Sequence, residues 1–125
     1  MWKGFEFNKP YDGVIPDKIN GVELPIEYIE FMRRHNGCYG DTGESYLILF
    51  PIEELEESND DYNVSEYLEG CFIIGNNGAG ELYGINKEGK YFIVPDIIEE
   101  EYLTVIGDSI EGLPEDINNF WKNLR

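Results

Sequence analysis

Apolar side chains recur at helical spacing near both ends of the chain. In residues 24–35 one face carries Leu24, Tyr28, Phe31 and Met32, with His35 on the same stripe, and Pro25 suits a first helical turn. In residues 110–124 the apolar positions again follow helical steps, and Pro114 can begin a helix there. The pattern predicts a helix over residues 24–35, ended by Asn36 and Gly37, and another over residues 113–124 that covers one side of a sheet.

The centre of the chain has short apolar and β-branched runs that are typical of strands. They cover residues 44–50, 71–74, 81–86, 91–94 and 102–106. Residues 87–90, Lys-Glu-Gly-Lys, have the length of a hairpin turn between two of these runs. Residues 52–58 suit a short acidic helix with Leu55 as its apolar anchor, and residues 96–101 an acidic connector.

This order of elements indicates an α+β fold, with a central, largely antiparallel sheet flanked by helices. Links of hairpin length leave no room for the crossover helices that a parallel sheet needs. The chain is 42% hydrophobic and 14% aromatic, enough to build a core. Because no repeat, linker or low-complexity segment interrupts the pattern, we expect a single domain over residues 1–125.

Charge excludes two classes of partner. The chain has 26 acidic and nine basic residues, for a formal net charge of −17. Nucleic acids and anionic membranes would repel such a surface, so we expect no direct contact with either. No apolar run approaches the roughly 20 residues of a membrane span, and the first residues lack the pattern of an export signal. We therefore expect a cytoplasmic protein whose Cys38 and Cys71 are free thiols.

Few residues suggest catalytic or metal chemistry. His35 and Cys38 are three positions apart, but a structural zinc site needs about four such ligands and only Cys71 remains. The same pair could form a Cys/His nucleophile, although anionic surroundings would raise the pKa of the cysteine. Among 26 acids a pair of nearby carboxylates carries little information. We expect no catalytic residue, no metal and no cofactor, with a small hydrolase as the weaker alternative.

The glycine-rich segment of residues 75–81, Gly-Asn-Asn-Gly-Ala-Gly-Glu, does not match a phosphate-binding loop. The Lys and Ser/Thr of a P-loop are missing, and Tyr83 stands where a dinucleotide-binding loop would have its third glycine. A turn between two strands is the simpler interpretation. A small-molecule-binding or regulatory module that uses Asn76 and Asn77 stays open as an alternative.

The acidic residues are concentrated in two windows. Residues 50–70 contain eight acidic residues and no basic one, and residues 96–116 again contain eight and none. Such windows can simply be solvated faces that keep a protein soluble. They can also be a docking surface for a basic partner, because complementary potentials speed association and select the partner.

Several segments resemble one known family. Residues 24–31, Leu-Pro-Ile-Glu-Tyr-Ile-Glu-Phe, followed by Asn36 and Gly37, resemble the "LP-x-x-[Y/F]-x-x-F … NG" signature of the SMI1/KNR4 (SUKH) superfamily. Residues 50–55, 73–81 and 105–110 are similar to later family segments, in the same order. Two features depart from the pattern: residues 14–23 leave space for only a short helix or none before the signature, and Ile110 stands where the family has an aromatic residue.

The resemblance implies an α+β fold and, in bacteria, an immunity role in polymorphic toxin systems. Members bind and neutralise a cognate toxin, often a nuclease, whereas fungal relatives are linked to the control of cell-wall synthesis. The resemblance implies no catalytic residue. The matching residues would be structural, in turns or in the core: Gly37, Gly75, Gly78, Gly80, Tyr28, Phe31 and Leu55.

Together these observations predict a non-enzymatic, immunity-type protein with a basic, nuclease-type toxin as its partner. An acidic surface would imitate the polyanion that such a toxin attracts. Tyr62 or Tyr67 could supply the aromatic anchors that charges rarely provide. The residues expected to contact the partner are Glu53, Glu54, Glu56, Glu57, Asp60, Asp61, Tyr62, Glu99, Glu100 and Glu101.

Overall fold

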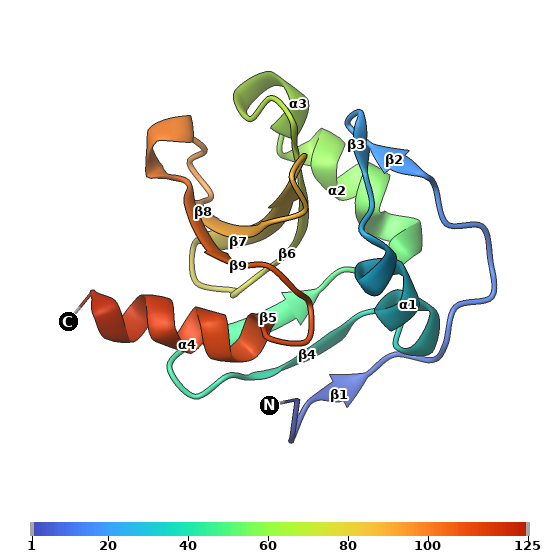
Figure 1. Ribbon diagram of the computed structural model, residues 1–125, viewed down its shortest axis with the longest axis horizontal. Coiled ribbons are helices and arrows are strands. Elements are labelled where there is room, and N and C mark those ends of the chain that lie inside the picture. Colours follow the sequence, from blue (N-terminus) through green and yellow to red (C-terminus); the bar gives the residue numbers. More distant parts are fainter. Residues whose placement is uncertain (1, 125) are drawn as a thin grey trace.

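The computed structural model describes residues 2–124 and confirms the α+β architecture (Figure 1). Seven antiparallel strands form one sheet in the order β1-β4-β5-β6-β7-β8-β9, and β2 and β3 form a separate hairpin. The strands of the sheet are β1 (Glu6–Phe7), β4 (Cys38–Asp41), β5 (Tyr46–Leu49), β6 (Cys71–Asn76), β7 (Glu81–Asn86), β8 (Tyr91–Pro95) and β9 (Thr104–Gly107). The hairpin consists of β2 (Lys18–Ile19) and β3 (Val22–Glu23).

Helices lie on both sides of this sheet. Figure 1 shows α4 on one side and α3, together with the orange segment before β9, on the other. The helical elements are α1 (Ile26–Arg34), the 3-10 turn η1 (Ile52–Glu54), α2 (Leu55–Asp61), α3 (Val64–Tyr67), the 3-10 turn η2 (Glu100–Tyr102) and α4 (Leu113–Asn123).

The central strands carry buried apolar side chains at successive positions because both faces of the sheet are covered. Successive side chains of a strand point to opposite faces. In β6, Phe72 and Ile74 join the larger core cluster with residues of α1 and α4, whereas Ile73 joins a smaller cluster with Val64 of α3 and Leu68, which follows α3. The sheet is therefore the middle layer between two cores.

Several predicted boundaries need correction. Helix α1 begins at Ile26 because Pro25 keeps an extended ψ of 143° and lies just before the helix. The predicted helix over residues 52–58 is a 3-10 turn followed by α2, which continues to Asp61. The predicted strand over residues 102–106 begins at Thr104, because Tyr102 belongs to η2. Within residues 14–23 the structure has the β2–β3 hairpin and no helix.

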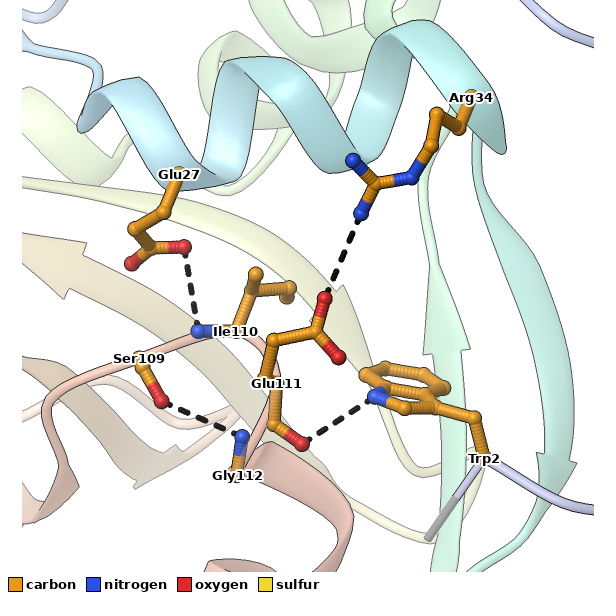
Figure 2. Close-up of polar contacts among 7 residues, drawn as sticks. All are labelled: Trp2, Glu27, Arg34, Ser109, Ile110, Glu111 and Gly112. Carbon is orange, nitrogen blue, oxygen red and sulfur yellow. Dashed lines mark hydrogen bonds and ion pairs between the residues drawn. The ribbon is translucent and has the colours of Figure 1, made fainter.

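Two glutamates, Glu27 and Glu111, join segments that are far apart in sequence. Glu27 Oε2 of α1 accepts a hydrogen bond from the Ile110 N–H at 3.2 Å (Figure 2). Glu111 forms an ion pair with Arg34 at 3.4 Å, and its carbonyl accepts a hydrogen bond from the Trp2 indole at 3.2 Å (Figure 2). These contacts fix the segment before α4 against α1 and the N-terminal segment.

Candidate functional site

The predicted partner-contacting carboxylates all lie on the surface. Each of the nine is exposed, and Tyr62 is half-buried. Within residues 2–124 one ion pair is present, Arg34–Glu111. In the described part of the chain, the carboxylates of residues 50–70 therefore form no ion pair with a Lys or Arg side chain.

The two acidic windows meet at a groove between α3 and the segment before β9. The groove has a volume of about 610 Å³. We call it the acidic groove, and its lining residues are Tyr62, Glu66, Tyr67, Asp96, Ile97, Ile98, Glu99 and Glu100. Four of these carry carboxylates and none is a Lys or Arg. The site combines negative charge with tyrosine and isoleucine side chains.

The α3 wall of this groove is fixed by the turn between α2 and α3. Asn63 has a left-handed φ of 53°, a conformation that asparagine tolerates better than most residues. Its carbonyl accepts hydrogen bonds from the N–H groups of Glu66 and Tyr67. Val64 and Leu68 are buried in the smaller core cluster. This anchoring leaves Glu66 and Tyr67 exposed at the groove.

Helix α2 is attached to the sheet by a buried asparagine. Asn59, which is 2% exposed, accepts a hydrogen bond from the Ile73 N–H at 2.8 Å and donates one to the Ile73 carbonyl at 3.0 Å. Both polar groups of one β6 residue are thus satisfied by a single side chain. The same contact fixes the end of α2, where Tyr62 enters the groove.

The opposite wall is fixed through the sheet. The Asp96 N–H donates a hydrogen bond to the Gly80 carbonyl at 2.8 Å. Ile98 and Leu103 pack against the smaller core cluster. Asp96, Ile97, Glu99 and Glu100 remain exposed between these anchors.

The structure brings three of the ten predicted residues into the acidic groove: Tyr62, Glu99 and Glu100. The other seven do not line it. Glu53 accepts a hydrogen bond from the Asn36 side chain at 2.6 Å, which ties η1 to the end of α1. Glu56 and Asp60 line a separate hollow of about 210 Å³ that also contains Lys18.

Five groove residues were absent from the predicted set of ten, although Tyr67 had been considered as an aromatic anchor: Glu66, Tyr67, Asp96, Ile97 and Ile98. Glu66 and Asp96 belong to the two cation-free windows, so the charge pattern already contained them. Ile97 and Ile98 form an apolar pair within the acidic connector of residues 96–101, and this pair is the sequence feature that points to them. Their proximity to Tyr62 depends on the pairing of β6, β7 and β8, which brings the two windows together.

The glycine-rich segment forms the expected turn, although Gly75 and Asn76 belong to β6. Asn77 accepts hydrogen bonds from the N–H groups of Ala79 at 2.9 Å and Glu81 at 3.1 Å, and Asn76 accepts one from Gly78 at 3.0 Å. The acceptor oxygens of both amides are thus used within the turn. A hollow of about 230 Å³ at this turn shares Tyr62 and Asp96 with the acidic groove.

The two cysteines are poorly suited to nucleophilic chemistry. Cys38 and Cys71 are 2% and 6% exposed. Burial raises the pKa of the Cys38 thiol to about 12 and that of the Cys71 thiol to about 11. The His35 ring lies against Phe7, with 4.3 Å between ring centroids. Within residues 2–124, no three His, Cys, Asp or Glu side chains form a group that could hold a metal ion.

Comparison with models of protein families gives a match over most of the chain. The model of the SMI1 / KNR4 family (SUKH-1) matches residues 17–122, which include every residue of the acidic groove. No curated protein matches the chain. Among the described residues, no helix is long and apolar enough to cross a membrane.

Proposed function

The chain belongs to the SMI1 / KNR4 family (SUKH-1), and from this membership we propose that it binds and neutralises a cognate toxin as an immunity protein. The family includes immunity proteins, is associated with toxin partners and is generally non-enzymatic. In this proposal the protein acts by binding alone and catalyses no reaction. We place the encounter in the cytoplasm, where the free thiols of Cys38 and Cys71 would persist.

The observation that carries this proposal is the meeting of both acidic windows at one groove. A nuclease gathers Lys and Arg side chains to hold its polyanionic substrate. The acidic groove presents four carboxylates to such a surface, from Glu66 on one wall and Asp96, Glu99 and Glu100 on the other. The partner is therefore a basic, nuclease-type toxin, and the groove imitates the charge of its substrate.

Aromatic and apolar side chains in the groove would supply affinity that charge alone does not. Tyr67 is 51% exposed and Ile97 is 79% exposed. Together with half-buried Tyr62, they form a surface that a partner can desolvate. A tyrosine ring also attracts an arginine guanidinium through its π-electrons. We propose an arginine side chain of the toxin between Tyr62 and Tyr67.

The seven predicted residues outside the groove have a different proposed role. Their carboxylates extend the negative potential beyond the contact region, which raises the rate of encounter with a basic protein. They are Glu53, Glu54, Glu56, Glu57, Asp60, Asp61 and Glu101. We expect their loss to slow association more than it weakens the complex.

The experiment is a growth-protection assay with the toxin encoded beside this gene. Wild-type protein should restore growth and co-purify with the toxin. The triple variant Glu66→Lys, Asp96→Lys, Glu100→Lys should lose both properties. Its matched control is Glu6→Lys, Glu23→Lys, Glu30→Lys, which makes the same change in net charge at exposed sites outside the groove and should retain protection. Equal protection by both variants, or a neighbouring product that is neither toxic nor bound, would refute the proposal.

A further inference from the structure

Within residues 2–124, the last strand of the sheet has one edge that pairs with no other strand. Strand β9 pairs with β8 on one side and is terminal in the strand order. Its residues are Thr104, Val105, Ile106 and Gly107. Proteins usually protect such an edge with charged side chains, proline or bulges, because its unpaired N–H and C=O groups can bind another strand. The four residues of β9 include neither a charge nor a proline, and the strand has one irregularity, a shift in its register with β8 between Val105 and Gly107.

A groove runs along this edge beside α4. It has a volume of about 400 Å³, and its lining residues come from β9, from α4 and from Leu124, which follows α4. They are Thr104, Val105, Ile106, Asp116, Asn119, Phe120, Asn123 and Leu124, and we call the site the β9–α4 groove. Helix α4 lies against β9 (Figure 1). No residue is shared with the acidic groove.

The apolar part of the groove is accessible. Val105 is 50% exposed and Leu124 is 64% exposed, and Phe120 is half-buried between them and the core. Tyr102, just before β9, is 58% exposed. A free strand edge next to an apolar helix face is the arrangement that binds extended peptides by strand addition. Backbone groups of the edge provide hydrogen bonds, and the helix provides a pocket for alternate side chains.

The negative charge around the β9–α4 groove indicates which kind of segment it can bind. Among the described residues that line the groove, the one with a charged side chain is Asp116, whose carboxylate packs over Gly107 at the end of β9. Asp108 and Glu101 are exposed at the two ends of the strand. Two copies of a chain with a net charge of −17 repel one another, which disfavours pairing of β9 with itself. A segment with basic side chains fits this surface better.

We propose that the β9–α4 groove binds an extended, basic segment of a partner protein, which adds to the sheet as a strand beside β9. Apolar residues of the segment would pack on Val105, Phe120 and Leu124, and a Lys or Arg would pair with Asp116. The acidic groove takes no part in this binding. The inference is therefore independent of the toxin-neutralising function, and either can be refuted without the other.

The test uses synthetic peptides that alternate valine and arginine. A second peptide has the same composition with the arginines in one block, and a third is the alternating peptide with N-methyl groups on every other amide, so that one backbone edge cannot pair. Binding is measured by fluorescence anisotropy, and hydrogen exchange reports protection of individual amides. The alternating peptide should bind at least about tenfold more tightly than either control and should protect amides of residues 104–107.

Two protein variants locate the site. Val105→Lys adds a positive charge to the strand edge and should weaken binding of the alternating peptide about tenfold. Val14→Lys is the matched control, because Val14 is 86% exposed and lies outside the groove. Asn119→Lys, at an exposed position on the α4 side, repeats the test if Val105→Lys folds poorly.

Three results would overturn the inference. One is equal binding of all three peptides, which would indicate unspecific attraction to an acidic protein. Another is protection of the acidic groove instead of residues 104–107. The third is a concentration-dependent dimer in sedimentation that protects the β9 amides without any peptide, because the occupant would then be a second copy.

Discussion

The hydroxyl of Tyr91 donates a hydrogen bond to Glu27 Oε1 at 2.8 Å and so joins β8 to the first turn of α1. The other oxygen of the same carboxylate accepts a hydrogen bond from the Ile110 N–H. Tyr91 is fully buried and Glu27 is half-buried. One carboxylate thus connects a helix, a central strand and the segment before α4.

Glu27 makes stability depend on pH. Burial raises the pKa of this carboxyl above its ordinary value of 4.5, although the bonds from Tyr91 and Ile110 act in the opposite direction. The folded state therefore holds the proton more tightly, and the stabilisation is complete below about pH 4.5 and is lost as pH rises through the folded pKa. We expect Glu27→Gln to reduce the fall in unfolding free energy between pH 4.5 and neutral pH, measured by urea denaturation.

Two comparisons complete this test. Burial also raises the pKa of Asp116, so the Gln variant should keep part of the pH dependence. Glu30→Gln changes an exposed carboxylate on the same helix and should behave like the wild type. A Glu27→Gln variant whose unfolding free energy has the wild-type pH dependence would contradict this account of Glu27.

Asn59 should be one of the most sensitive polar positions in the molecule. Asn59→Ala leaves the buried N–H and C=O groups of Ile73 without their side-chain partner. We expect the free energy of unfolding to fall by about 3 kcal/mol. Asn119→Ala, at an exposed position of α4, should change it by less than about 0.5 kcal/mol. Similar losses in both variants, measured by chemical denaturation, would show that the bonds to Ile73 contribute little.

Gly75 is required by the close approach of β5 and β6. A Cβ at this position would collide with the backbone carbonyl of Ile48, which cannot move without separating the two strands. Gly75→Ala should therefore cost about 3 kcal/mol or more. Gly89 has a left-handed φ of 77° but open space around it, so Gly89→Ala should cost only about 1 kcal/mol. Thermal unfolding of the two variants checks the difference, and the reverse order would be incompatible with the pairing of β5 and β6.

The thiols should react slowly in the folded protein. Raised pKa values of about 12 for Cys38 and about 11 for Cys71 leave little thiolate at pH 8, and burial blocks access. We expect a disulfide reagent to modify neither cysteine rapidly in native protein and both in urea. Rapid labelling of Cys38 in the native protein would contradict this expectation and would again support a nucleophilic pair of Cys38 and His35.

The hairpin of β7 and β8 shows how far local sequence can determine structure. Its strands are rich in apolar and aromatic residues, and the turn is recognisable from Asn86 and Gly89. The Asn86 side chain accepts hydrogen bonds from the N–H groups of Glu88 and Lys90, each at 3.0 Å. Here the local pattern and the tertiary structure agree, so the prediction is confirmed nearly to the residue.

Strand β4 shows where local reasoning failed. Cys-Tyr-Gly-Asp has no run of β-branched residues, and Gly40 ordinarily weakens a strand. The reason for Gly40 is tertiary, because the ring of Phe5 lies where a Cβ would be. Strand β1 has only two residues and pairs with β4 across about 30 positions of sequence, which no local pattern reveals.

The same distinction applies to the site. Charge counting identified both acidic windows, and it placed Glu99 and Glu100 correctly among exposed residues. It could not show that Glu66 and Asp96 face the same groove, because that proximity arises only when β6, β7 and β8 pair. It also could not separate Glu53, whose carboxylate is occupied by Asn36, from carboxylates that are free to meet a partner.

The most direct test of the central claim is the salt dependence of complex formation with the neighbouring toxin. Association and dissociation rates would be measured from about 50 mM to about 500 mM salt. Wild-type protein and the Glu6, Glu23, Glu30 control should associate rapidly and slow steeply with salt. The Glu66, Asp96, Glu100 variant should dissociate at least about tenfold faster and show a shallower salt dependence. Identical rates for the groove variant and the control variant would contradict the claim that the acidic groove is the partner-binding site.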